Sequence, residues 1–286
     1  MKNRLEFFLL IIFYYFSKIV RLKIASSLGG LLLYIYGTFS KRNKIALSNL
    51  SIVFPDKTTS EKRKILRKMW FHFGRVIGEF PHLGSIRMEN NKDIHIEGIN
   101  NLLGSLNKYK NCLFFSAHIG NWELTSHLLT ERGHRIHFIY RAPNNKFVDD
   151  LLRKIRLNYG VNLIRKGSSG AKECIKVLNK KGGNIGMLID QKMNDGIETN
   201  FFNQKVKSAP AIAKFALKYH CPIIPAVCFR LRSVKFRISY LTPITPEKIK
   251  KLGNEKKVMN YLNKYLEDWI TENPHQWIWF HNRLND

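Results

Sequence analysis

The chain has 286 residues, 44% of them hydrophobic, and 48 lysines and arginines against 21 aspartates and glutamates give a formal net charge of +27. The sequence shows no internal repeat and no low-complexity segment, and its length predicts one globular domain with an N-terminal extension. The charge requires an anionic partner, which could be nucleic acid, anionic lipid or an acidic protein.

The first element is an apolar stretch over residues 5–20, interrupted only by Glu6 near its start and Ser17-Lys18 near its end. It is slightly shorter than the ~20 residues of a typical membrane span. No cleavage site with small residues follows it, which argues against a signal peptide. We predict an N-terminal membrane-anchoring helix that spans the membrane or lies on it.

A second apolar stretch covers residues 24–39 and contains Gly29, Gly30 and Gly37. These glycines favour a helix packed on the membrane or on the protein. Most basic residues follow these segments, so the positive-inside rule places the body of the protein in the cytoplasm. We predict anchoring or interfacial helices in residues 1–40 and a globular domain in residues 41–286.

After a short helix or turn that closes at Pro55, an amphipathic helix is predicted over residues 60–80. Alternating elements follow it. Strands are expected at 94–98, 112–116, 135–140, 161–164, 184–190 and 223–229, and helices at 145–159, 171–179, 210–219 and 255–271. A hairpin-like partner of the last strand ends near Tyr240. This alternation predicts an α/β fold with a largely parallel, twisted sheet flanked by helices.

The four cysteines show neither the paired spacing of a metal site nor a dense disulfide pattern. Cys112 and Cys228 fall within apolar, strand-like runs, so we expect them to be small core residues. This usage agrees with a reducing compartment.

His118 follows the apolar strand at 112–116, at the point where Gly120 breaks the run and Trp122 begins a helical pattern. Such turns carry the chemistry of many α/β proteins. Glu123 lies five positions later across the bend, so its carboxylate can fold back and accept a hydrogen bond from one imidazole nitrogen. The other nitrogen would then serve as a general base. Alternatively, His118 and Glu123 form a helix cap or a polar pair in the core and have no catalytic role.

Asp190 ends a nearly all-apolar strand and should emerge at the same carboxyl edge of the sheet as His118. A carboxylate there is either a functional group or an organiser of the following loop, and the sequence favours neither.

Eight short pieces share the order of motifs in one known family. They are Arg42 to Pro55, Trp70 to Glu79, His118 to Glu123, Tyr140 to Asn145, Asp190-Gln191, Phe201-Phe202, Pro225 with Arg230, and Pro274 to Arg283. In these pieces the chain resembles the late (secondary) acyltransferases of lipid A biosynthesis along almost its whole length. The resemblance implies a glycerolipid-acyltransferase-like fold.

The resemblance further implies transfer of a fatty acyl chain from acyl carrier protein to a hydroxyl of a 3-hydroxyacyl chain on a lipid A precursor. It implies no cofactor, no metal and no nucleic acid. The implied partners are acyl carrier protein, the lipid A precursor and an anionic membrane surface. The implied location is the bacterial inner membrane, with the acyltransferase domain on the cytoplasmic side.

For single residues, the resemblance implies that His118 is the base and Glu123 its orienter. It also implies supporting roles in substrate binding or oxyanion stabilisation for Arg156, Asp190 and Arg141. Arg156 would stabilise the thioester oxyanion or hold a phosphate. Without the resemblance, it would be a solvated cation on a helix.

Two positions depart from the family pattern. The usual Tyr-Arg-Pro is Tyr140-Arg141-Ala142-Pro143 here, and the usual closing Arg-Trp is Arg283-Leu284. Neither departure touches His118 or Glu123.

Three alternatives compete with lipid A acylation. The nearest is a related acyltransferase acting on a glycerophospholipid or on a glycolipid such as a phosphatidylinositol mannoside. A basic nucleic-acid-binding protein is disfavoured, because no helix-turn-helix, zinc-finger or RNA-recognition motif is present. A non-catalytic membrane scaffold is disfavoured because both His118 and Glu123 are present.

Overall fold

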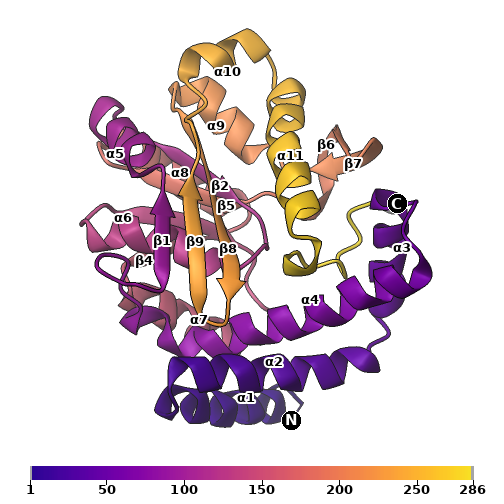
Figure 1. Cartoon of the computed structure of the whole chain (residues 1–286). Helices are drawn as coiled ribbons and strands as arrows, with labels where there is room; N and C mark the ends of the chain where they lie inside the picture. Colours follow the sequence, from indigo (N-terminus) through magenta and orange to yellow (C-terminus); the bar gives the residue numbers. More distant parts are fainter. Residues whose placement is uncertain (1, 285–286) are drawn as a thin grey trace.

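The computed structural model describes residues 2–284, and a seven-stranded sheet forms its centre (Figure 1). In spatial order the strands are β1 (Ile94–Glu97), β9 (Lys235–Tyr240), β8 (Ile223–Arg232), β2 (Leu113–Ser116), β5 (Asn184–Leu188), β3 (Ile136–Tyr140) and β4 (Val161–Arg165). All neighbours are parallel except β8 and β9, which form an antiparallel hairpin. The predicted largely parallel sheet is confirmed.

Strand β2 is buried on both faces, which explains its unbroken apolar sequence. Successive side chains of a strand point to opposite faces. Accordingly, Phe115 belongs to one apolar core and Phe114 to another on the other side of the sheet.

Helices cover both faces (Figure 1). The core around Phe115 receives side chains from α8 (Ser168–Asn179), α9 (Ala211–Tyr219), α10 (Pro246–Leu252) and α11 (Glu255–Glu272). The core around Phe114 receives them from α5 (Ile99–Lys108) and α6 (His127–Glu131). Cys112 and Cys228 are buried in this second core, as predicted.

The N-terminal part consists of α1 (Lys2–Ile19), α2 (Leu22–Thr38), α3 (Asn43–Val53) and α4 (Thr59–Glu79). Helix α4 begins with a capping box between Thr58 and Glu61. Figure 1 shows α2 lying along α4 and α1 lying beside α2. A Cβ atom on Gly29 of α2 would collide with the carbonyl oxygen of Gly74 on α4. The second apolar stretch therefore packs on the protein with its glycine face.

The other faces of α1 and α2 present large apolar side chains to the surface. They include Leu5, Phe8, Leu9 and Ile12 on α1, and Leu31, Leu32 and Ile35 on α2. Within residues 2–284, no single helix is both long and apolar enough to cross a membrane. Helices α2 and α3 meet that criterion only as a pair bent by 92°. The anchoring helix expected in residues 5–20 therefore stays a prediction.

The division into residues 1–40 and 41–286 stays a prediction, and its end residues Met1, Asn285 and Asp286 lie outside the described chain. One unexpected element follows Asp190: a two-stranded hairpin of β6 (Lys192–Phe201) and β7 (Gln204–Ser208). Its turn residues Phe202 and Asn203 have φ angles of 48° and 58°.

Candidate active site

The turn that carries His118 lies at the carboxyl end of β2. Gly120 follows at a φ of 57°, and a Cβ atom there would collide with the carbonyl oxygen of Cys228 on β8. Only glycine fits this close approach in the left-handed region. The glycine that breaks the apolar run thus fixes the direction in which the chain leaves the sheet.

Asp190 lies beside His118, because β5 is the parallel neighbour of β2 and Asp190 follows its end. Its Oδ1 accepts a hydrogen bond from Nδ1 of His118 at 2.9 Å, and its Oδ2 accepts one from the backbone N–H of His118 at 3.0 Å. The indole of Trp277 donates to Oδ2 at 2.8 Å. The expectation that Asp190 emerges at the same sheet edge as His118 is confirmed.

The Asp190 carboxylate is charged in this setting. Burial favours a raised pKa, but the electrostatic attraction to the His118 ring and the hydrogen bonds from His118 and Trp277 outweigh it and hold the pKa of Asp190 well below its usual range. An ionised carboxylate only accepts, so Nδ1 of His118 carries a proton and Nε2 is left as the basic nitrogen. The side chain of His118 is 20% exposed and that of Asp190 only 1%.

The prediction that Glu123 accepts a hydrogen bond from His118 is wrong. Glu123 accepts hydrogen bonds from Arg156 at 2.6 and 3.0 Å, from Tyr159 at 2.9 Å and from the indole of Trp122 at 3.1 Å. After Asn121 the chain enters the 3-10 helix η2 (Trp122–Ser126), and the carboxylate meets α7 (Lys146–Asn158) instead of the imidazole. A buried carboxylate gains more from a guanidinium charge than from a neutral ring.

Glu123 and Arg156 form a buried ion pair. Burial opposes ionisation of both groups, but their mutual attraction lowers the pKa of Glu123 and raises that of Arg156. The guanidinium also lies over the ring of Phe80, 5.4 Å from its centre. Arg156 is therefore a fixed, partnered cation and not a solvated one.

Arg141 is exposed just after β3. Across residues 2–284, no hydrogen bond or salt bridge ties it to His118, Asp190, Glu123 or Arg156. The structure thus divides the predicted residues into the pair His118–Asp190, the pair Glu123–Arg156, and Arg141 alone.

Two further polar side chains beside His118 were not among the predicted site residues. Nε2 of Gln191 lies 3.4 Å from each ring nitrogen of His118 and 2.9 Å from Nε2 of His281. Burial and electrostatic repulsion from the His118 ring lower the pKa of His281 to about 4. Both residues occur in the sequence pieces noted above, in Asp190-Gln191 and in the closing run, and their place there was the only signal.

The C-terminal segment holds the Asp190 loop. The buried guanidinium of Arg283 donates to the backbone oxygens of Ile189 at 3.1 Å and Gln191 at 3.0 Å. The side-chain amide of Asn49 on α3 donates to the oxygens of Trp279 and His281 at 2.8 and 2.7 Å. Residues from both ends of the chain thus position the loop that orients His118.

A buried ion pair supports the other side of the turn. Glu79 at the end of α4 accepts hydrogen bonds from both terminal nitrogens of Arg230 at 2.6 and 2.7 Å. It also accepts from the amide of Asn121 at 2.7 Å and the hydroxyl of Ser26 at 2.6 Å. One carboxylate therefore joins α2, α4, β8 and the His118 turn.

The described residues contain no group of three His, Cys, Asp or Glu side chains placed to hold one metal ion. What they do contain is an imidazole oriented by a buried carboxylate, with a ring that is partly exposed. Such a pair can remove a proton from a hydroxyl group during attack on a carbonyl.

Comparison with known proteins assigns the chain to a family. A search of curated proteins finds no match. The family described as bacterial lipid A biosynthesis acyltransferase matches residues 3–286, which is nearly the whole chain. The suspected relationship is confirmed: the chain belongs to the bacterial lipid A biosynthesis acyltransferases.

Proposed function

We propose that this acyltransferase moves a fatty acyl chain from the thioester of acyl carrier protein to a hydroxyl of a 3-hydroxyacyl chain on a lipid A precursor. The observation that carries the proposal is the His118–Asp190 pair at the carboxyl edge of the sheet, in a chain of this family. The acceptor supplies its own hydroxyl, so the mechanism needs a base but no protein nucleophile.

The reaction begins when Nε2 of His118 takes the proton of the acceptor hydroxyl as its oxygen attacks the thioester carbonyl. Asp190 stabilises the imidazolium that forms. The tetrahedral intermediate then collapses with breakage of the C–S bond, and the thiolate of the carrier leaves with the proton of the imidazolium. General base catalysis of this kind contributes roughly 10²–10⁴-fold.

The oxyanion requires a donor other than the amides of the turn. The N–H groups of His118, Ile119 and Gly120 already donate to Asp190, Ala117 and Gln276. The amide of Gln191 has two N–H groups and needs only one for the neutral ring of His281, so the second can donate to the oxyanion.

Arg156 and Glu123 take a positioning role in this mechanism. Arg156 is paired by two hydrogen bonds with Glu123, and Glu123 also accepts the indole N–H of Trp122. The ring of Trp122 lies 5.1 Å from that of His118, between centres. We assign the ion pair to holding Trp122 against the base.

The charge and the surface of the protein support a proposal for its location. The apolar faces of α1 and α2 are suited to the membrane boundary, and the net charge of +27 attracts an anionic leaflet and an acidic carrier protein. We propose attachment to the inner membrane with residues 41–286 on the cytoplasmic side.

The test is an in vitro assay with acyl carrier protein loaded with C12, C14 or C16 chains. The acceptors are a tetra-acylated lipid A precursor, a glycerophospholipid and a phosphatidylinositol mannoside. We expect a penta-acylated product that His118→Ala abolishes. Acylation of the glycerophospholipid or mannoside alone would assign the chain to the related acyltransferases.

A further inference from the structure

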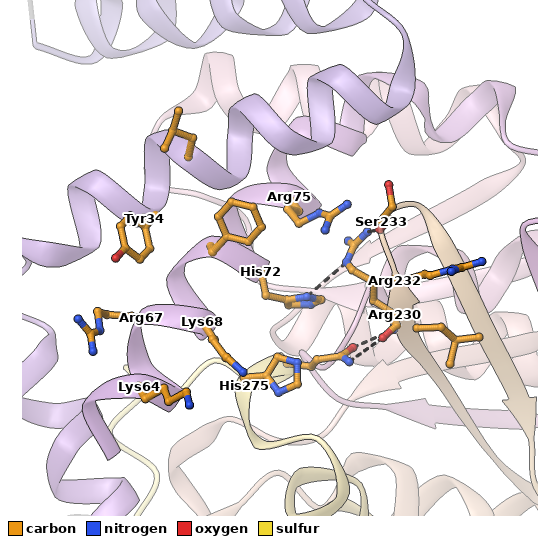
Figure 2. A pocket seen from close by; sticks show the side chains of 14 residues that line it. Tyr34, Lys64, Arg67, Lys68, His72, Arg75, Arg230, Arg232, Ser233 and His275 are labelled. Atoms are coloured by element: carbon orange, nitrogen blue, oxygen red, sulfur yellow. Dashed lines mark hydrogen bonds between the residues drawn. The ribbon is translucent and has the colours of Figure 1, made fainter. Parts of the chain in front are cut away.

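A cavity of about 620 Å³ opens between α2, α4 and the β8–β9 hairpin (Figure 2). It is separate from the site at His118. His72 and Gln276, which line it, hydrogen-bond to the oxygen and the nitrogen of Gly120, each at 3.1 Å. His72 and Gln276 therefore separate the cavity from the turn that carries His118.

The wall formed by α4 is strongly basic. Lys64, Arg67, Lys68 and Arg75 line the cavity, and their spacing of three, four and eleven positions places them on one face of the helix. Like charges at this spacing destabilise a helix. This arrangement of charges therefore does not stabilise α4.

The hairpin contributes Arg232 from the opposite side (Figure 2), and among residues 2–284 no aspartate or glutamate lines the cavity. In the part of the chain that the structure describes, none of Lys64, Arg67, Lys68 and Arg232 forms a salt bridge. These four cations therefore have no paired carboxylate among the described residues.

The nearby carboxylate of Glu79 is occupied by Arg230. Arg75 donates through Nε to the hydroxyl of Ser26 at 2.9 Å. Burial and the charge of Arg230 lower the pKa of Arg75 to about 10. An anion in the cavity would relieve this repulsion.

The rim of the cavity is apolar. Leu31 is 51% exposed, Tyr34 38% and Leu231 57%. Leu31 and Tyr34 belong to the surface of α2 that also exposes Leu32 and Ile35. A basic hollow beside an exposed apolar helix face matches a ligand with an anionic head and apolar chains.

We propose that this cavity binds the phosphate head group of a membrane lipid, with Lys68, Arg75 and Arg232 around the phosphate and α2 against the acyl chains. It is a second site, separate from the transfer centre. Two lipids carry this chemistry: an anionic phospholipid, and the phosphorylated acceptor itself. The second case rests on the proposed function.

Binding of the full-length protein to phosphatidylcholine vesicles with and without phosphatidic acid tests the site. The variant is Lys68→Gln/Arg232→Gln, which removes one exposed cation from each wall. The matched control is Lys41→Gln/Arg63→Gln, which removes two exposed cations that do not line the cavity. We expect the variant to lose about tenfold more affinity for phosphatidic acid vesicles than the control, the loss of roughly one hydrogen bond to a charged group.

Equal losses in variant and control would show diffuse attraction to the membrane and overturn the proposal. Unchanged vesicle binding with a raised KM for the carrier protein would also overturn it, since the basic surface would then dock a protein.

Transfer kinetics separate the two lipids. If the acceptor phosphate occupies the cavity, the variant raises KM for the phosphorylated acceptor and not for its dephosphorylated form. If a phospholipid occupies it, vesicle binding falls while the acceptor KM is unchanged. His118→Ala should bind phosphatidic acid vesicles like the wild type, so a failure of the transfer mechanism would not be confused with a failure of this site.

Discussion

The carboxylate of Asp190 holds His118 at two points, accepting hydrogen bonds from the imidazole Nδ1 at 2.9 Å and from the backbone N–H at 3.0 Å. The two bonds fix both the ring and the backbone that carries it. The protein therefore specifies which ring nitrogen is free before any substrate binds.

Asp190→Asn should lower kcat for transfer by roughly 10²–10⁴-fold, because an amide neither fixes the tautomer of His118 nor stabilises the imidazolium. Steady-state kinetics with acylated carrier protein measure the effect. Asp150→Asn, at an exposed position of α7, is the matched control and should keep full activity. Equal activity of both variants would show that Asp190 is not part of the catalytic pair.

Glu123→Gln should act through stability and positioning. It leaves the buried charge of Arg156 without its counter-ion, which we expect to cost about 3 kcal/mol of unfolding free energy. The apparent pKa of the rate profile should stay that of the wild type, because Glu123 does not touch His118. If this pKa moved in Glu123→Gln but not in Asp190→Asn, Glu123 would be the orienting group after all.

His281 makes stability depend on pH. Its pKa is lowered to about 4 in the folded protein, so below the ordinary value of about 6.5 the unfolded chain binds a proton that the folded chain does not. The contribution of His281 to stability is therefore complete above about pH 6.5 and is lost as the pH falls toward 4.

Denaturant unfolding between pH 7 and 4 measures this loss, which should be on the order of 1–3 kcal/mol for this group. His281→Gln should make the pH dependence less steep, and His95→Gln, at an exposed position, should not. A steeper or unchanged slope in His281→Gln would contradict the assignment.

Gly74→Ala should separate α2 from α4, because its Cβ atom would collide with the carbonyl oxygen of Gly29. Overpacking of this kind costs about 1–3 kcal/mol. Gly104→Ala on α5 is the matched control, since its Cβ atom would meet nothing within 4 Å. That control should be neutral or stabilising by up to about 1 kcal/mol. Calorimetry of both variants measures the difference, and equal stability of the two would contradict the close packing of α2 on α4.

The sequence predicted the elements around the site well, because the parallel strands are continuous apolar runs bounded by glycine and polar residues. The positions of His118 and Asp190 at one sheet edge followed directly. The hydrogen bond between them could not be predicted, because it depends on β2 and β5 being neighbours in the sheet. Both strands are buried on both faces, and their sequences do not indicate which strands they pair with.

The missed features come from long-range packing. Trp277 and Arg283 reach Asp190 and its loop only because the last segment folds back over the sheet edge. The β6–β7 hairpin was missed because Phe202, a residue untypical of such turns, adopts a positive φ beside Asn203. Glu123 was assigned to the wrong partner because nearness in sequence favoured His118 over Arg156.

The most direct test of the account is mass spectrometry of a tetra-acylated lipid A precursor incubated with acylated carrier protein and the full-length enzyme. We expect a product heavier by one acyl chain with the wild type, nearly none with His118→Ala or Asp190→Asn, and a measurable amount with Glu123→Gln. Undiminished product with His118→Ala would contradict the proposed base.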